Sequence, residues 1–81
     1  MEVFVVTFEI EMNNNIQKQV MQAPRFVLEQ QFVSLVKQAY ESRVPVRVKM
    51  SMVVPIWIQF ENRWVEREHS VEFVNKAWQN L

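Results

Sequence analysis

The chain has 81 residues, a formal net charge of zero and 49% hydrophobic residues, which predicts a single small domain over residues 1–81. It contains no glycine, no cysteine and, because all nine acidic residues are glutamate, no aspartate. These absences exclude glycine-rich phosphate-binding loops, disulfide frameworks and calcium loops of the usual pattern. No stretch approaches the ~20 apolar residues of a membrane span, and the first apolar run is too short for a signal peptide. We therefore expect a cytoplasmic protein.

The first element is a strand, because residues 3–12 alternate between apolar and polar side chains, with Val6 and Phe8 on the apolar side. Three asparagines at 13–15 then break the pattern, and asparagine is the residue that best replaces glycine where φ must be positive. Residues 16–22 are ambiguous, since they fit either a return strand or a loop. We favour a short return strand.

A long helix follows. Pro24 suits the first position of a helix, where its missing N–H costs nothing. Apolar residues then recur every three or four positions up to Tyr40, which predicts an amphipathic helix of about five turns that ends before Pro45.

Residues 46–52 alternate again and predict a further strand. Pro55 is expected to end this strand or to mark a bulge at a sheet edge, because proline cannot donate to a ladder. Residues 56–60 would then begin another strand.

The next segment predicts a hairpin with its charges on the solvent side of the sheet. A two-residue turn at 62–63 would place Phe60 opposite Val65. Trp57 and Trp64 would then share the other, polar side with several glutamates.

The chain is expected to end in a helix over residues 71–80, with Ser70 as its N-cap and Glu72 in its first turn. Together these elements predict an α+β fold. It consists of an antiparallel sheet of four to five strands, one long helix packed on the sheet and a short C-terminal helix, in the order β-(β)-α-β-β-β-α.

Catalysis is not expected. His69 is the only histidine, and although Glu66, Glu68 and Glu72 are close to it in sequence, an ordinary zinc site needs three or four nitrogen or sulfur ligands. Ser70 is next to His69 in the sequence, and neighbouring residues rarely have the geometry in which a base activates a nucleophile. The expected role of Ser70 as a helix cap explains its position instead. We predict no catalytic residue, no metal and no cofactor.

Nucleic-acid binding is the alternative function. Arg43, Arg47 and Lys49 could form a basic stripe, with Trp57 and Trp64 as stacking platforms on the same sheet. The glutamates of the tryptophan hairpin oppose this, because they would repel phosphates.

The leading hypothesis is a small non-catalytic binding or accessory protein that acts by protein–protein contact, as a homodimer or with another protein. Trp57 and Trp64 are its candidate partner-binding residues, because two tryptophans on a polar face are costly to leave in water. Either the C-terminal helix covers them or another chain does. Residues 3–12 or 56–60, as edge strands, would also offer backbone groups to a partner.

Overall fold

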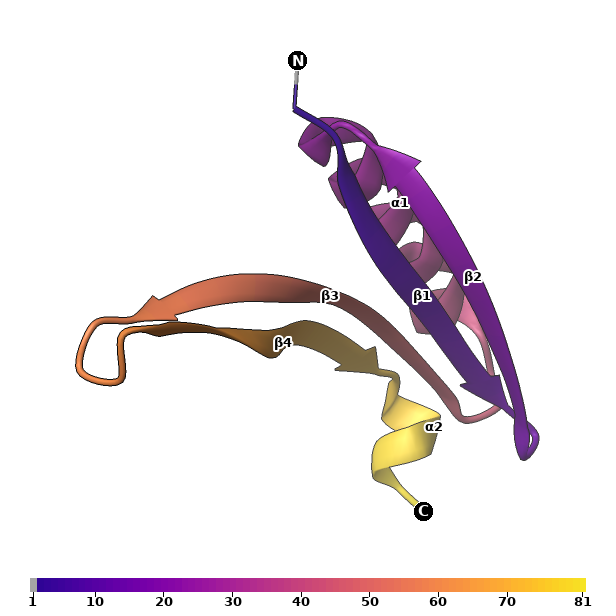
Figure 1. Ribbon diagram of the computed structural model, residues 1–81. Helices are drawn as coiled ribbons and strands as arrows, with labels where there is room; N and C mark the ends of the chain where they lie inside the picture. The colour runs from indigo at the N-terminus through magenta and orange to yellow at the C-terminus, as the bar shows by residue number, and fades with distance from the viewer. Residues whose placement is uncertain (1) are drawn as a thin grey trace.

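The computed structural model describes residues 2–81, which form a four-stranded antiparallel sheet with one long helix on one face (Figure 1). The elements in chain order are β1 (Phe4–Met12), β2 (Asn15–Ala23), α1 (Arg25–Glu41), β3 (Val46–Ile58), β4 (Arg63–Val74) and α2 (Lys76–Gln79). The sheet order is β2-β1-β3-β4. This confirms the α+β class, the antiparallel sheet, the long helix and a short helix at the C-terminal end.

The first hairpin turns on two asparagines. Met12 pairs with Asn15, and the two residues between them, Asn13 and Asn14, have φ of 54° and 64°. A two-residue hairpin turn of this kind needs positive φ at both positions, which asparagine tolerates in a chain without glycine. The favoured return strand over 16–22 is therefore confirmed as part of β2.

β1 is a central strand, so the expectation that it lies at an edge was wrong. β2 pairs with one side of β1, and β3 pairs with the other side from Thr7, opposite Ser51, to Met12, opposite Val46. The alternation within one strand predicts the strand itself but does not indicate which other strands will pair with it.

α1 begins directly after Pro24, whose carbonyl accepts hydrogen bonds from the N–H groups of Val27 and Leu28. Pro24 is thus the N-cap and not the first helical residue. The helix ends at Ser42, whose N–H donates to the carbonyl of Ala39, before Pro45 as predicted. Within residues 2–81, no helix combines the length and apolar character that crossing a membrane requires.

The core lies between α1 and the sheet, where even-numbered residues of β1 and β3 face the helix. Phe8 and Val48 are the largest fully buried side chains. Phe32 and Leu35 of α1 are half-buried and pack against both groups of buried residues. These two groups contain Val6, Phe8, Ala23 and Leu28 on one side and Ala39, Val46 and Val48 on the other.

β3 does not end or bulge at Pro55, which corrects the expected break and leaves four strands. The ladder with β4 runs through the pair of Pro55 and Glu66 without interruption as far as Ile58 opposite Arg63. This places the proline nitrogen, which carries no hydrogen, on the side of β3 away from β4. The expected two-residue turn was also wrong, because four residues, 59–62, join the strands.

The C-terminal helix starts five residues later than expected. Val71 and Phe73 extend the alternation of β4 and pair with Met50 and Val48, so this segment is strand and Ser70 is not an N-cap. Asn75 caps α2 instead, with its side chain accepting a hydrogen bond from the N–H of Trp78.

The sheet divides into two parts beyond the pair of Thr7 and Ser51. We call residues 52–69, the outer half of the β3–β4 hairpin, the arm, and the other described residues the body. Figure 1 shows the arm leaving the body at a wide angle, with β1, β2 and α1 on the other side of the fork. The result is an elongated molecule of 48 × 30 × 17 Å.

Candidate interaction surface

The two candidate tryptophans lie directly opposite each other on the arm. Trp57 of β3 pairs with Trp64 of β4, and their ring centroids are 5.5 Å apart at an interplanar angle of 61°, an edge-to-face contact. Trp57 is 44% exposed and Trp64 65% exposed. Their predicted placement on one face of the hairpin is confirmed, although the register differs by four residues from the one expected: Val65 lies opposite Ile56 and not opposite Phe60.

The C-terminal helix does not cover these rings. α2 follows the end of β4 that pairs with the beginning of β3, whereas the tryptophans adjoin the turn at the other end of the hairpin (Figure 1). Both rings are therefore exposed within the chain, and of the two expected outcomes the cover by the C-terminal helix is not found. Phe60, in the turn itself, is 99% exposed.

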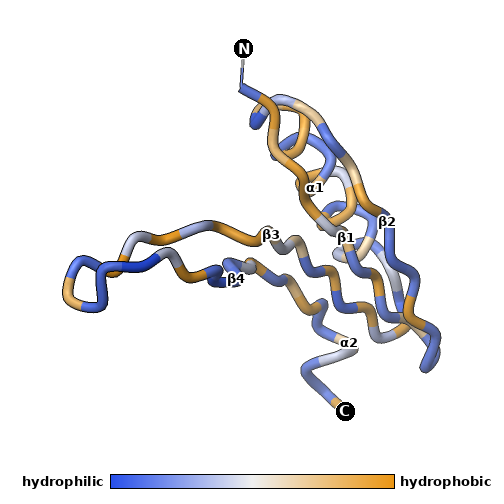
Figure 2. Tube along the Cα trace, in the orientation of Figure 1, coloured by the Kyte–Doolittle hydropathy of each residue, from blue (hydrophilic) through white to orange (hydrophobic). Residues whose placement is uncertain are grey.

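Strand β3 gives the arm apolar residues on both faces, whereas β4 adds mostly charged ones. We call the side with Val53, Trp57 and Trp64 the tryptophan face, and the opposite side the aliphatic face. On the aliphatic face the pairing register places Val54, Ile56 and Ile58 of β3 together with Val65 of β4. The β4 side of this face also has three polar residues, Arg63, Arg67 and His69. Figure 2 shows the same feature as a hydrophobic stretch along β3, while β4 returns through mostly hydrophilic residues.

The free edge of the arm is poorly suited to adding another strand. In the described part of the chain, β3 pairs with β4 alone beyond Ser51. Pro55 stands in the middle of this edge and offers no N–H, a feature that blocks edge-to-edge pairing. A partner of the arm therefore has to bind its side chains. Residues 56–58 lie on a free edge, as expected, while pairing of this edge with a partner stays a prediction that Pro55 disfavours.

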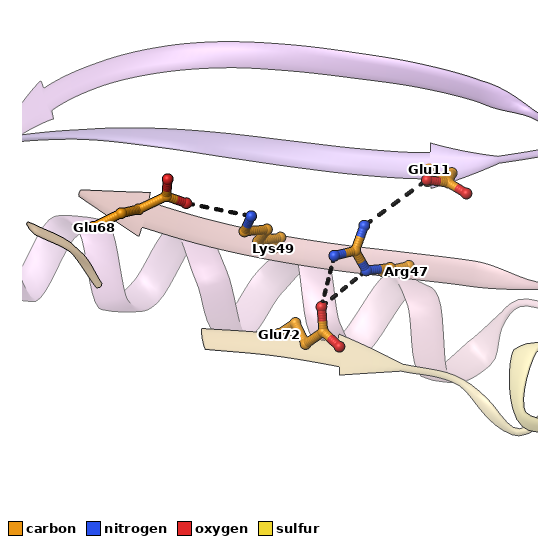
Figure 3. A network of polar contacts seen from close by, with 5 residues as sticks. All are labelled: Glu11, Arg47, Lys49, Glu68 and Glu72. Atoms are coloured by element: carbon orange, nitrogen blue, oxygen red, sulfur yellow. Dashed lines mark hydrogen bonds and ion pairs between the residues drawn. The ribbon is translucent and has the colours of Figure 1, made fainter. Parts of the chain in front are cut away.

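Two of the three basic residues of the alternative hypothesis, Arg47 and Lys49, lie on the same sheet face as the tryptophans but are already paired with glutamates (Figure 3). Arg47 contacts Glu72 at 2.8 Å and Glu11 at 3.8 Å. Lys49 contacts Glu68 at 3.3 Å. These contacts join β1, β3 and β4 across the sheet and neutralise most of the positive charge.

The basic stripe is also separated from the tryptophans. Arg47 and Trp57 are ten residues apart on one strand, or about 33 Å at the usual rise. Arg43 lies in the exposed connection between α1 and β3, outside the sheet. The structure thus does not bring the five residues into one binding surface.

An apolar groove opens on the helix side of the fork. It has a volume of about 390 Å³, and the ion pair of Arg25 and Glu29 flanks it. We call it the fork groove, and its apolar lining comes from Phe4, Val6, Leu28, Met50, Met52 and Val71. Sequence alternation places these residues on one face but gives no indication that the face is left partly open.

His69 lies on β4 opposite Met52 and is exposed. Glu68 points to the other face of the sheet and pairs with Lys49, so the neighbouring glutamates do not converge on the imidazole. Across residues 2–81, no group of three histidine, cysteine or acidic side chains is placed to hold a metal ion.

Sequence reasoning missed Asn75, which is 2% exposed. Its amide nitrogen donates to the carbonyls of Ala39 and Val44 at 2.9 and 2.8 Å, and its oxygen accepts from the N–H of Val46 at 3.1 Å. Asn75 therefore joins the end of α1, the start of β3 and α2. An asparagine directly before a short helical stretch was the available signal.

No family model, no curated protein and no solved structure matches this chain. The functional argument therefore rests on the geometry of the arm and of the fork.

Proposed function

We propose that the protein is a small non-catalytic accessory protein that binds another protein through the tryptophan face of its arm. The observation that carries the proposal is the exposed edge-to-face pair of Trp57 and Trp64 on a hairpin that projects from the body. Solvent exposure of two such rings is unfavourable, and tryptophan is among the residues most enriched where proteins bind each other tightly.

The geometry of the pair favours binding. Each ring restrains the other, so little side-chain freedom is left to lose when a partner docks. The adjacent turn adds the exposed ring of Phe60, which extends the aromatic surface to the tip of the arm. A projecting aromatic tip fits a concave apolar site on a partner.

We propose a non-catalytic protein because the chain has few of the residue types that catalysis commonly uses. The chain has one histidine and no cysteine or aspartate, and the histidine lies on an exposed strand. General acid–base or nucleophilic catalysis at neutral pH needs a base positioned against a second reactive group. We propose no cofactor for the same reason.

Nucleic-acid binding is the less favoured function. Arg47 and Lys49 would have to leave Glu72, Glu11 and Glu68 before they could contact phosphates. The test is the affinity for an oligonucleotide. An affinity that falls steeply with salt and falls further in an Arg47→Met variant would make nucleic-acid binding the favoured function.

The proposal is tested by replacing Phe60 with a photo-crosslinking amino acid in the cells of origin and identifying the crosslinked protein by mass spectrometry. That protein is then purified and its dissociation constant measured by calorimetry. We expect Trp64→Ala to weaken binding at least about 30-fold, the loss typical of a central interface residue. Tyr40→Ala, at an exposed aromatic residue of α1 on the body, should leave the constant unchanged.

Two results would contradict the proposal. One is a purified partner that binds wild type and the Trp64→Ala variant equally. The other is a crosslink that forms only with nucleic acid or only with further copies of this chain.

A further inference from the structure

The inference starts from the uninterrupted apolar run MVVPIWI at residues 52–58. Strands covered on one face alternate, whereas strands covered on both faces have continuous apolar runs. Under α1, β3 alternates between apolar and polar residues, whereas along the arm it is continuously apolar. The tryptophan face of the arm is assigned above to another protein, so the aliphatic face still needs an occupant.

The exposed area of the chain is larger than its mass predicts. The accessible surface is 6515 Å², whereas a compact monomer of 9.8 kDa exposes about 5,200 Å². The radius of gyration is 15.2 Å, compared with about 12 Å for a compact chain of this length. The excess of about 1,300 Å² is more than the ~800 Å² that each partner contributes to a stable interface.

No second layer of the chain covers the aliphatic face, whose apolar residues are only half-buried by their neighbours on the hairpin. β3 is one continuous strand from the body to the tip, and it carries the arm away from α1 (Figure 1). The fork groove, however, lies at the root of the same arm and faces the same side of the sheet, because Met50 and Met52 alternate in register with Val54 and Ile56. Each molecule thus has an apolar strip on its arm, bordered by Arg63 and Arg67, and an apolar groove that this strip does not reach.

We propose that a second copy of this chain fills the fork groove, with the aliphatic face of each arm inserted into the groove of the other molecule. A two-fold axis makes this exchange reciprocal, so that both arms and both grooves are covered and the assembly closes as a dimer. The zero net charge of the chain does not oppose association of two copies. The contact is made by side chains, since Pro55 leaves the arm edge unfit for strand addition.

The proposal shares the arm with the proposed function but uses its opposite face, so either can fail alone. A helix surface is the main competitor, because Phe26, Val33 and Tyr40 are exposed on α1. These residues are seven apart, or about 10 Å along the helix, with polar residues between them. Scattered exposed apolar residues are normal on a monomer, whereas the arm is continuous.

The test is the mass of the full chain by light scattering, from micromolar to near-millimolar concentration. We expect twice the 9.8 kDa of one chain. Ile56→Glu should raise the dimer dissociation constant at least about tenfold, because the new carboxylate would move from water into a groove with a mainly apolar lining. The circular-dichroism spectrum should be retained, since Ile56 lies outside the core clusters.

The matched control is Val33→Glu, which places the same charge on the exposed face of α1 and should leave the mass unchanged. A photo-crosslinker at Ile58, in a mixture of isotopically heavy and light chains, should join the arm of one copy to the peptide of the other that contains the groove residue Val71. Trp64→Ala should not change the mass, which separates this test from that of the proposed function.

A monomeric mass at every concentration would overturn the proposal. Loss of the dimer in Val33→Glu but not in Ile56→Glu would also overturn it, as would crosslinks from Ile58 that reach only the Phe26–Tyr40 side of α1.

Discussion

In the body, β1 and the first part of β3 place their even-numbered side chains under α1, and Phe8 and Val48 are excluded from solvent. In the arm the same strand β3 continues with even more apolar residues, yet in the described chain none of residues 52–69 is buried. Apolar content alone therefore does not make a core. A strand adds buried side chains to the core only where another layer covers it.

This contrast indicates what each region is for. A two-stranded hairpin without a covering layer is marginally stable in water. The arm is held by its ladder with β4 and by the Trp57–Trp64 contact. A costly apolar projection of this kind is consistent with a contact surface, and the three predictions below test the division between body and arm.

The largest difference is expected between two phenylalanines. Phe8→Ala should lower the free energy of unfolding by about 3–5 kcal/mol, because Phe8 is 1% exposed and its removal leaves a cavity. Phe60→Ala at the arm tip should change it by less than about 0.5 kcal/mol. Urea unfolding followed by circular dichroism measures both, and a similar loss in the two variants would remove the distinction.

A smaller effect is expected at the junction where the body is closed by hydrogen bonds. Asn75→Ala should cost about 2–3 kcal/mol, because the N–H of Val46 and the carbonyls of Ala39 and Val44 lose their partner. The matched control is Asn80→Ala, at an exposed residue after α2, which should stay within about 0.5 kcal/mol. Equal thermal melts of the two variants would show that the Asn75 contacts do not hold the body together.

The smallest effect concerns the ion pairs. Arg47→Met in the body should cost about 0.5–1 kcal/mol at low salt and less at high salt, because Arg47 contacts two glutamates and is only partly exposed. Arg63→Met, which breaks the exposed pair with Glu61 on the arm, should have no measurable effect on unfolding. Denaturation at two salt concentrations distinguishes them, and an equal or salt-independent loss would argue against the cross-strand network.

Elements with a local pattern could be predicted from the sequence. The alternation around Phe8, the helical spacing before Tyr40 and the asparagines at the first turn each lie within one short window. The segment at Val71 was misassigned because its apolar residues fit both a helix and a strand. Pairing with Met50 and Val48, more than twenty residues away, resolved it in favour of the strand.

The candidate site divides in the same way. That Trp57 and Trp64 share one face followed from strand periodicity, which is a property of the backbone and does not depend on a register shift of four residues. Their direct contact depended on the four-residue turn, and the pairing of Arg47 with Glu11 and Glu72 depended on strand order. Neither was visible in the sequence.

The amino-acid sequence alone thus indicated the first strand, the long helix and a break at the asparagines 13–15, and it excluded phosphate-binding loops and disulfides. Only the tertiary structure decided that β3 passes through Pro55, that the sheet forks beyond Thr7, and that the tryptophans project from the body. The physical reason is range. Backbone preference and side-chain periodicity act over a few residues, whereas strand order and the extent of the covering layer depend on which distant segments pack together.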